Sequence, residues 1–194
     1  MTQIPAPNSL ERFALKQRLS MMTNRFEVRA GGPDGPVVAL AQQKRLALRE
    51  AVTFYADEQR SQPLFGFRAR QVMDLNAGYD VTDAAGAPLG FFRKDFGQSL
   101  LRSTFHVEVP SLGLRASGSE RSQLVALLRR FTDFSWPVHF DFATAEGVPV
   151  MSVERQWSLR DAYAVELPSG PGGARMDWRV AACLAVACDV LLSR

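Results

Sequence analysis

The sequence of 194 residues has few of the side chains from which most catalytic and metal sites are built. It contains two histidines, His106 and His139, and two cysteines, Cys183 and Cys188. Each histidine occupies a polar position in an alternating stretch, which is typical of a solvated surface residue rather than a catalytic base. The cysteines are five residues apart, so on a helix they point about 140° apart and cannot pair with each other. Small, reduced, buried thiols are the simpler interpretation.

Known catalytic motifs are also missing. The sequence has no nucleophile elbow, phosphate loop, paired-histidine zinc helix or dinucleotide-binding glycine fingerprint. The acidic stretch that begins at Asp74 has part of the spacing of a calcium loop, but Tyr79 stands where glycine is needed and Ala85 where a bidentate glutamate is needed. We therefore expect no metal, no cofactor and no catalytic residues, and we favour a non-enzymatic protein.

Neither a leader peptide nor a membrane-spanning run is visible. Residues 1–8 lack a basic start followed by an apolar core. The apolar stretch from Val180 to Cys188 lies between Arg179 and Asp189 and is far shorter than the roughly 20 residues that a bilayer requires. We expect a cytoplasmic protein without a transmembrane span.

Lysine is scarce, since only Lys16, Lys44 and Lys94 are present and the other 20 of the 23 basic residues are arginine. The net charge of +3 and the pI of about 9.2 are mildly basic. This balance permits anionic partners but is far from the dense positive charge of a dedicated nucleic-acid binder. Arginine offers a two-pronged donor that suits phosphate, although genomic base composition also accounts for its excess.

Short stretches with the two-residue period of a strand dominate from Phe26 to Leu167. Phe105, Val107 and Val109 alternate with polar residues, for example, and turns rich in glycine, proline and aspartate separate such stretches. This pattern is typical of an all-β sandwich or barrel. Before it, Arg12 to Met22 is compatible with a short helix or an entering strand, and residues 1–11 are expected to form a flexible tail.

One hairpin motif occurs three times, as FEVRAGGPDGPVVALAQQK (residues 26–44), YDVTDAAGAPLGFFRK (residues 79–94) and FDFATAEGVPVMSVER (residues 140–155). Each copy has an aromatic strand, a glycine turn and an apolar return strand, and Gly86 aligns with Gly147. We interpret these two glycines as structural. Hairpins of this kind bury one face and need neighbours, so three copies favour a closed or nearly closed antiparallel sheet.

Two helices are expected besides the strands. Apolar residues from Leu124 to Phe131 follow a helical period on one face, with Ser119 as a candidate cap. The second helix, at about residues 176–192, is apolar on all sides and must be buried, and its slim side chains suit the inside of a barrel.

Asp189 would then lie near the interior and need a partner such as an arginine or backbone amides. Residues 12–194 are thus expected to form one domain.

Four segments carry a resemblance to a known superfamily: QRLSMMTNRFEV (residues 17–28), YDVTDAAGAPLGFFRKDFGQSLLRSTF (residues 79–105), VERQWSLRDAYAVEL (residues 153–167) and LAVACDVLL (residues 184–192). They resemble the tubby C-terminal-like superfamily and, within it, the LURP-one-related and scramblase-like proteins. The resemblance implies a barrel of about twelve strands around a central hydrophobic helix. Tubby proteins bind phosphoinositides, scramblases are linked to calcium-dependent lipid movement, and most LURP-one-related proteins have no settled activity. The acidic calcium segment of scramblases has no convincing counterpart here.

The leading functional hypothesis is a binding module that associates peripherally with anionic phospholipid headgroups. The proposed ligand-binding residues are Arg68, Arg70, Arg93, Lys94 and Arg102, which neighbouring strands could bring together. The competing interpretation of these residues is an ordinary charged surface. The alternative function is a protein-interaction or regulatory domain without lipid activity, with nucleic-acid binding as a minor branch. An enzyme of unrecognised type stays open only if the barrel holds a polar pocket.

Overall fold

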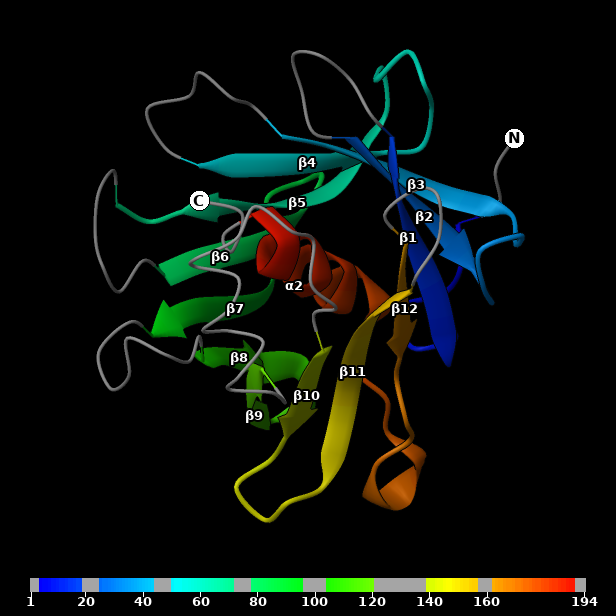
Figure 1. Cartoon of the computed structure of the whole chain (residues 1–194). Coiled ribbons are helices and arrows are strands. Elements are labelled where there is room, and N and C mark those ends of the chain that lie inside the picture. Colours follow the sequence, from blue (N-terminus) through cyan, green and yellow to red (C-terminus); the bar gives the residue numbers. More distant parts are fainter. Residues whose placement is uncertain are drawn as a thin grey trace, which may run out of the picture.

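The computed structural model of the chain is a closed, twelve-stranded antiparallel barrel, as predicted (Figure 1). It describes residues 4–18, 25–43, 50–71, 78–95, 104–120, 139–156 and 162–190. Each strand pairs with the next one along the chain, and β1 pairs with β12 to close the ring. The strands are β1 (Arg12–Arg18), β2 (Arg25–Ala30), β3 (Val37–Gln43), β4 (Ala51–Tyr55), β5 (Pro63–Ala69), β6 (Gly78–Asp83), β7 (Pro88–Asp95), β8 (Thr104–Val109), β9 (Leu114–Glu120), β10 (His139–Ala143), β11 (Pro149–Gln156) and β12 (Ala162–Glu166).

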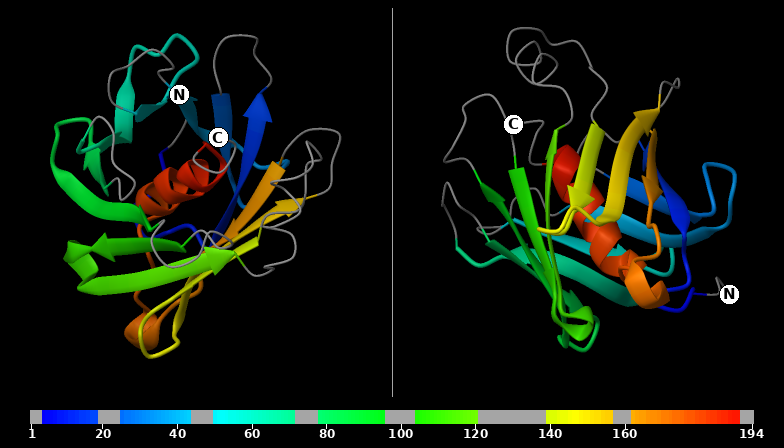
Figure 2. Two further views of the ribbon diagram at one scale, coloured as in Figure 1. Left: turned by 60° about the vertical axis from the view of Figure 1, so that its left-hand side comes forward. Right: turned by 90° about the horizontal axis from the view of Figure 1, so that it is seen from below.

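The centre of the barrel is filled by the helix α2 (Trp178–Val190), which strands surround in every view (Figures 1 and 2). All its residues except Arg179 and Asp189 are buried. Asp177 caps its start, because its Oδ1 accepts a hydrogen bond of 2.9 Å from the Arg179 backbone N–H. The predicted buried helix is confirmed as far as Val190, and no helix among the described residues is long and apolar enough to cross a bilayer.

The three repeated motifs form the hairpins β2–β3, β6–β7 and β10–β11. Gly86 and Gly147 have φ angles of +84° and +80°, which L side chains rarely adopt, and this explains why both turns carry glycine. Each hairpin also has a register shift close to its turn. Such bulges increase the local twist and so help the sheet to curl into a barrel.

Three segments were expected to contain a helix or a helix cap. Arg12 to Met22 was compatible with a helix or a strand, and its described part is the strand β1. Ser119 is not a helix cap, because it lies within β9 and pairs with Thr104 on β8 and Asp141 on β10. The expected helix from Leu124 to Phe131 falls outside the described residues.

Gly90 on β7 marks a close approach between the barrel wall and the central helix. A Cβ atom at this position would lie 2.9 Å from the Glu108 carbonyl oxygen and 3.3 Å from Val180 Cγ1. Val180 is fully buried on α2 and cannot move away without disturbing its neighbours. The wall therefore depends on glycine here for its fit around the helix.

We expect Gly90→Ala to lower the free energy of unfolding by about 1–3 kcal/mol because the added methyl group overpacks the core. Urea unfolding followed by circular dichroism measures the loss. Gly170→Ala is the matched control, since its Cβ atom would meet only the Ala174 carbonyl oxygen, at 3.4 Å. Equal stability of the two variants would contradict a tight fit at Gly90.

The N-terminal segment, residues 4–11, lies against the start of α2, where Figure 2 shows the N-terminus beside that end of the barrel. The Trp178 backbone N–H donates to the Pro7 carbonyl oxygen at 3.0 Å, and its indole N–H donates to the Pro5 carbonyl oxygen at 3.3 Å. Arg175 donates to the Asn8 carbonyl oxygen and to the Glu11 carboxylate. The segment that the sequence suggests as a flexible tail thus supplies both acceptors for the fully buried Trp178.

Deletion of residues 1–9 tests whether this segment contributes to stability. We expect a loss of about 2 kcal/mol in the free energy of unfolding, because two buried N–H groups lose their acceptors. The expected readouts are a lower urea midpoint and a red shift of tryptophan emission. Deletion of residues 1–3 alone is the control. A flexible tail without structural role would instead leave both deletions equal to the full chain.

Candidate anion-binding site

Outward side chains from β5 to β9 form two neighbouring rows, because paired residues of an antiparallel sheet share a face. The first row crosses five strands and contains Arg68, Asp80, Phe91, Glu108 and Arg115. The second row, one step nearer the end where α2 stops, contains Gly78, Arg93, His106 and Ser117. The pairing of strands thus gathers cations that are far apart in the sequence.

Arg70 forms a fixed ridge on this face. Its guanidinium binds the Asp80 carboxylate with two nitrogens, with the shortest contact at 2.6 Å from Nη2 to Oδ1, and lies 4.0 Å above the centre of the Phe91 ring. The hydrogen bond to Asp80 raises the pKa of Arg70 above its ordinary value. Because Asp80 already offsets its charge, Arg70 is better suited to positioning Phe91 than to binding a ligand.

Arg68 and Arg93 are exposed on either side of this ridge, and neither makes an ion pair with any other described residue. Arg68 borders a shallow groove of about 560 Å³ over β4, β5 and β6. Gly66 forms the floor of that groove between Thr53 and Thr82, which are its register partners. The groove is also lined by Asp80, which is paired with Arg70, and by Asp83, whose carboxylate accepts hydrogen bonds from the Ala85 and Ala87 backbone N–H groups. With these acids engaged, hydroxyl groups on the floor and a guanidinium at the rim can accept an anion.

Arg93 borders a second groove, of about 440 Å³, over β7, β8 and β9. We call it the Arg93 groove; its polar lining residues are Arg93, His106, Glu108, Arg115 and Ser117. His106 Nε2 lies 3.8 Å from Asp95 Oδ2, and Arg115 Nε lies 3.7 Å from Glu108 Oε1. Asp95 is therefore beside His106, and Glu108 is beside Arg115. Arg93 makes no ion pair with a described residue, so it is the clearest positive charge in the groove.

Lys94 does not share this surface with Arg93. Successive residues of a strand point to opposite faces, and Lys94 points into the barrel, where it is 4% exposed and its Nζ lies 6.0 Å from the centre of the Phe105 ring. Arg102, the remaining sequence-predicted cation, lies outside the described residues. The structure therefore brings together Arg68, Arg70 and Arg93 but separates Lys94 from them.

The barrel interior around Lys94 is polar near the end of α2. Burial raises the pKa of the Cys188 thiol, the charge of Lys94 lowers it, and the carboxylates of Asp189 and Glu120 raise it further. These charges are consequently close enough to act on one sulfur atom. Cys183 and Cys188 are both buried free thiols.

Asp189 accepts a hydrogen bond from the Tyr163 hydroxyl group on β12. The sequence suggests an arginine or backbone amides as its partner, and a tyrosine was not foreseen. Tyr163 itself lies on the inner face and is buried, with the Arg155 guanidinium 6.0 Å from the centre of its ring. Asp189 therefore belongs to the polar end of the interior, and its structural role stays a prediction.

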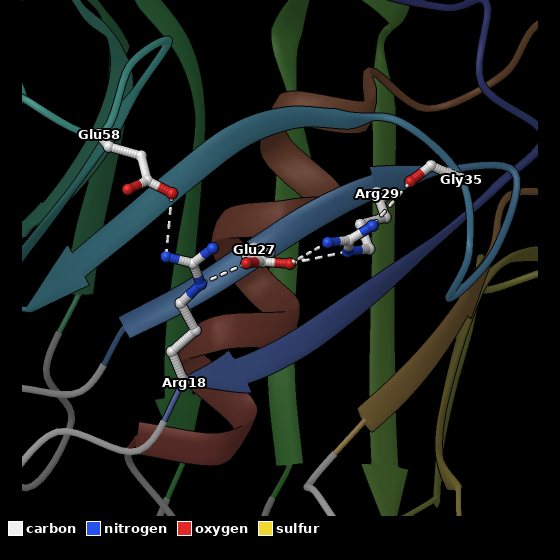
Figure 3. Close-up of polar contacts among 5 residues, drawn as sticks. All are labelled: Arg18, Glu27, Arg29, Gly35 and Glu58. Atoms are coloured by element: carbon white, nitrogen blue, oxygen red, sulfur yellow. Dashed lines mark hydrogen bonds and ion pairs between the residues drawn. The ribbon is translucent and has the colours of Figure 1, made fainter.

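A second charged cluster, on the outer face of β1 and β2, was missed from the sequence (Figure 3). Glu27 lies between Arg18 and Arg29 and accepts hydrogen bonds from both guanidinium groups. Its side chain is 4% exposed although it points outward, because the two arginines cover it. Arg18 also contacts the exposed Glu58 at 3.0 Å, and Arg29 donates to the Gly35 carbonyl oxygen. With both arginines engaged in this way, the cluster stabilises the wall rather than presenting free charge.

The Glu27 cluster predicts acid sensitivity. Burial alone raises the pKa of Glu27, but hydrogen bonds from Arg29 and Arg18 outweigh it and lower the pKa below the ordinary value of 4.5. A lowered folded-state pKa stabilises the protein above about pH 4.5, and this contribution is lost as the pH falls through the lower, folded value. We expect Glu27→Gln to cost about 1–2 kcal/mol at neutral pH and to reduce the loss of stability on acidification.

Urea unfolding at neutral and acidic pH measures both effects. Glu58→Gln is the matched control, because it removes a 65% exposed partner of the same Arg18 and should cost less than about 0.5 kcal/mol. Equal costs for the two substitutions would show that Glu27 is no more important than a surface acid.

Comparison with known proteins agrees with this architecture. The model of the LURP-one-related family matches residues 37–189, which include the strands from β3 to β12 and nearly all of α2. No curated protein sequence matches the chain. The match covers well over half of the chain and includes the face that carries Arg68 and Arg93. The chain therefore belongs to the LURP-one-related family, within the tubby-like C-terminal superfamily.

Proposed function

We propose that this protein is a non-enzymatic binding module that associates peripherally with anionic phospholipid membranes through the outer face of β5 to β9. The observation that carries the proposal is the pair of exposed guanidinium groups, Arg68 and Arg93, held on either side of the Arg70 ridge. Membership of a tubby-like family supports a binding module in general. The proposal places the protein in the cytoplasm, where anionic lipids face the interior of the cell.

The physical basis is electrostatic. An arginine near an anionic membrane surface contributes about 1 kcal/mol, and this attraction falls off within a Debye length. Arg68 and Arg93 are both on rigid strands of the same face, so a flat surface can approach both at once. Their combined contribution of about 2 kcal/mol corresponds to roughly a thirtyfold change in affinity.

Sedimentation with phosphatidylcholine vesicles, with and without phosphatidic acid, tests the proposal. We expect binding only to the anionic vesicles, with a loss of binding at high salt. The double substitution Arg68→Gln and Arg93→Gln should weaken binding roughly thirtyfold. Calcium should not be required.

The matched control is Arg12→Gln with Arg25→Gln, which removes the same net charge from the outer faces of β1 and β2. Equal weakening by both pairs would show that only the net charge matters and would overturn the proposed site. Absence of binding to anionic vesicles at low salt would overturn the lipid function and favour the alternative of a protein-interaction domain.

A further inference from the structure

A largely apolar groove lies at the end of the barrel where α2 begins, beside the proposed membrane-binding face. Its volume is about 590 Å³, and it is formed by the start of β9, the β10–β11 turn and the segment from Pro168 to Met176. We call it the apolar groove; its apolar side chains include Leu112, Leu114, Val148, Val150 and Met176. Leu112, Leu114 and Val148 are only partly buried, so each offers apolar surface to an occupant.

The apolar groove adjoins the Arg93 groove. Both are lined by Arg115 on β9 and by Ala145 in the β10–β11 turn. The Arg115 side chain is 82% exposed, and within the described part of the chain its ion pair is with Glu108, at 3.7 Å. A charged depression and an apolar depression therefore lie on either side of Arg115.

The dimensions suit a particular class of molecule. Ser117 lies in the Arg93 groove and Leu114 in the apolar groove, about 10 Å apart along β9. Ser117 points to the outer face, whereas Leu114 lies on the inner side and pairs with the buried Val109, so a ligand that reaches both must pass over the end of the barrel beside Arg115. An anion that carries a hydrocarbon chain a few bonds from its charge can reach both grooves at once. The chain would cover Leu114 and Val148, while Arg93, Arg115 and the Ser117 hydroxyl group would bind the charge.

We propose that the joined grooves bind one single-chain phospholipid, with its phosphate on Arg93 and Arg115 and its acyl chain in the apolar groove. This inference rests on the proposed function, because it names the lipid class for the same face. A peptide fits less well, since a closed ring of twelve paired strands has no free edge on which peptide backbone could add. Two acids also line the grooves: Glu108 is beside Arg115, and Glu146 is in the β10–β11 turn next to Ala145.

The direct test is isothermal titration calorimetry with a short-chain lysophosphatidic acid, kept below the concentration at which it forms micelles. Two probes accompany it: glycerol 3-phosphate, which has the phosphate but no chain, and a lysophosphatidylcholine of the same chain length, whose phosphate charge is balanced by choline. We expect lysophosphatidic acid to bind at least tenfold more tightly than either, because only this probe satisfies both grooves.

Variants separate the two halves of the site. Arg115→Gln should weaken binding of lysophosphatidic acid at least fivefold, and Val148→Asp should weaken it at least tenfold by charging the apolar groove. Arg12→Gln and Leu40→Asp are matched controls on the outer faces of β1 and β3 and should leave binding unchanged. If Val148→Asp lowers the melting temperature, Leu114→Gln replaces it as a neutral change in the same groove.

The outcomes distinguish this inference from the proposed function. Equal affinity for lysophosphatidic acid and glycerol 3-phosphate, or full binding by a folded Val148→Asp variant, would overturn the single-chain site even if anionic vesicles still bind through Arg68 and Arg93. Tight, chain-dependent binding that is lost in both Arg115→Gln and Val148→Asp would support it.

Discussion

Burial of helix α2, which is apolar except for Arg179 and Asp189 near its two ends, is the constraint on which the rest of the structure depends. A helix with no polar face needs apolar surface on every side, and in this chain twelve strands supply it. The inner faces of the strands therefore carry aromatic and branched side chains, among them Phe65, whose ring meets that of Trp178 edge to face at 5.2 Å. Apart from the polar end of the interior near Lys94, polar side chains lie on the outer faces, so function is sought on the outside of the wall or at its ends.

The fold was largely predictable because its signals are local. Three glycine-turn hairpins and one helix without a polar face favour a closed or nearly closed sheet, and the positive φ angles at Gly86 and Gly147 explain why these residues recur. The family resemblance adds the number of strands. Ser119 shows where local signals mislead, since a serine before an apolar helical period suits a cap, whereas pairing with both neighbouring strands places it in β9.

The candidate site was less predictable because it depends on which strands pair and in which register. Arg93 and Lys94 are adjacent in the sequence, yet strand alternation places one outside and the other inside. The period of two was visible in the sequence and could have separated them. The meeting of Arg93 with His106 and Ser117 was not visible, because it follows from the pairing of β7, β8 and β9. The Glu27 cluster depends in the same way on the pairing of β1 with β2.

The pairing of β1 with β12 has a consequence for how the protein folds as it is synthesised. Neighbouring hairpins can form one after another as they leave the ribosome, but β1 keeps an unpaired edge until β12 has been made. The nascent sheet also lacks its central apolar filling until α2 emerges, after every strand. Closure is therefore a late step that joins the two extremes of the barrel, and a high contact order of this kind slows folding. In such a chain, the open sheet rather than the finished barrel is the state most exposed to aggregation and to capture by chaperones.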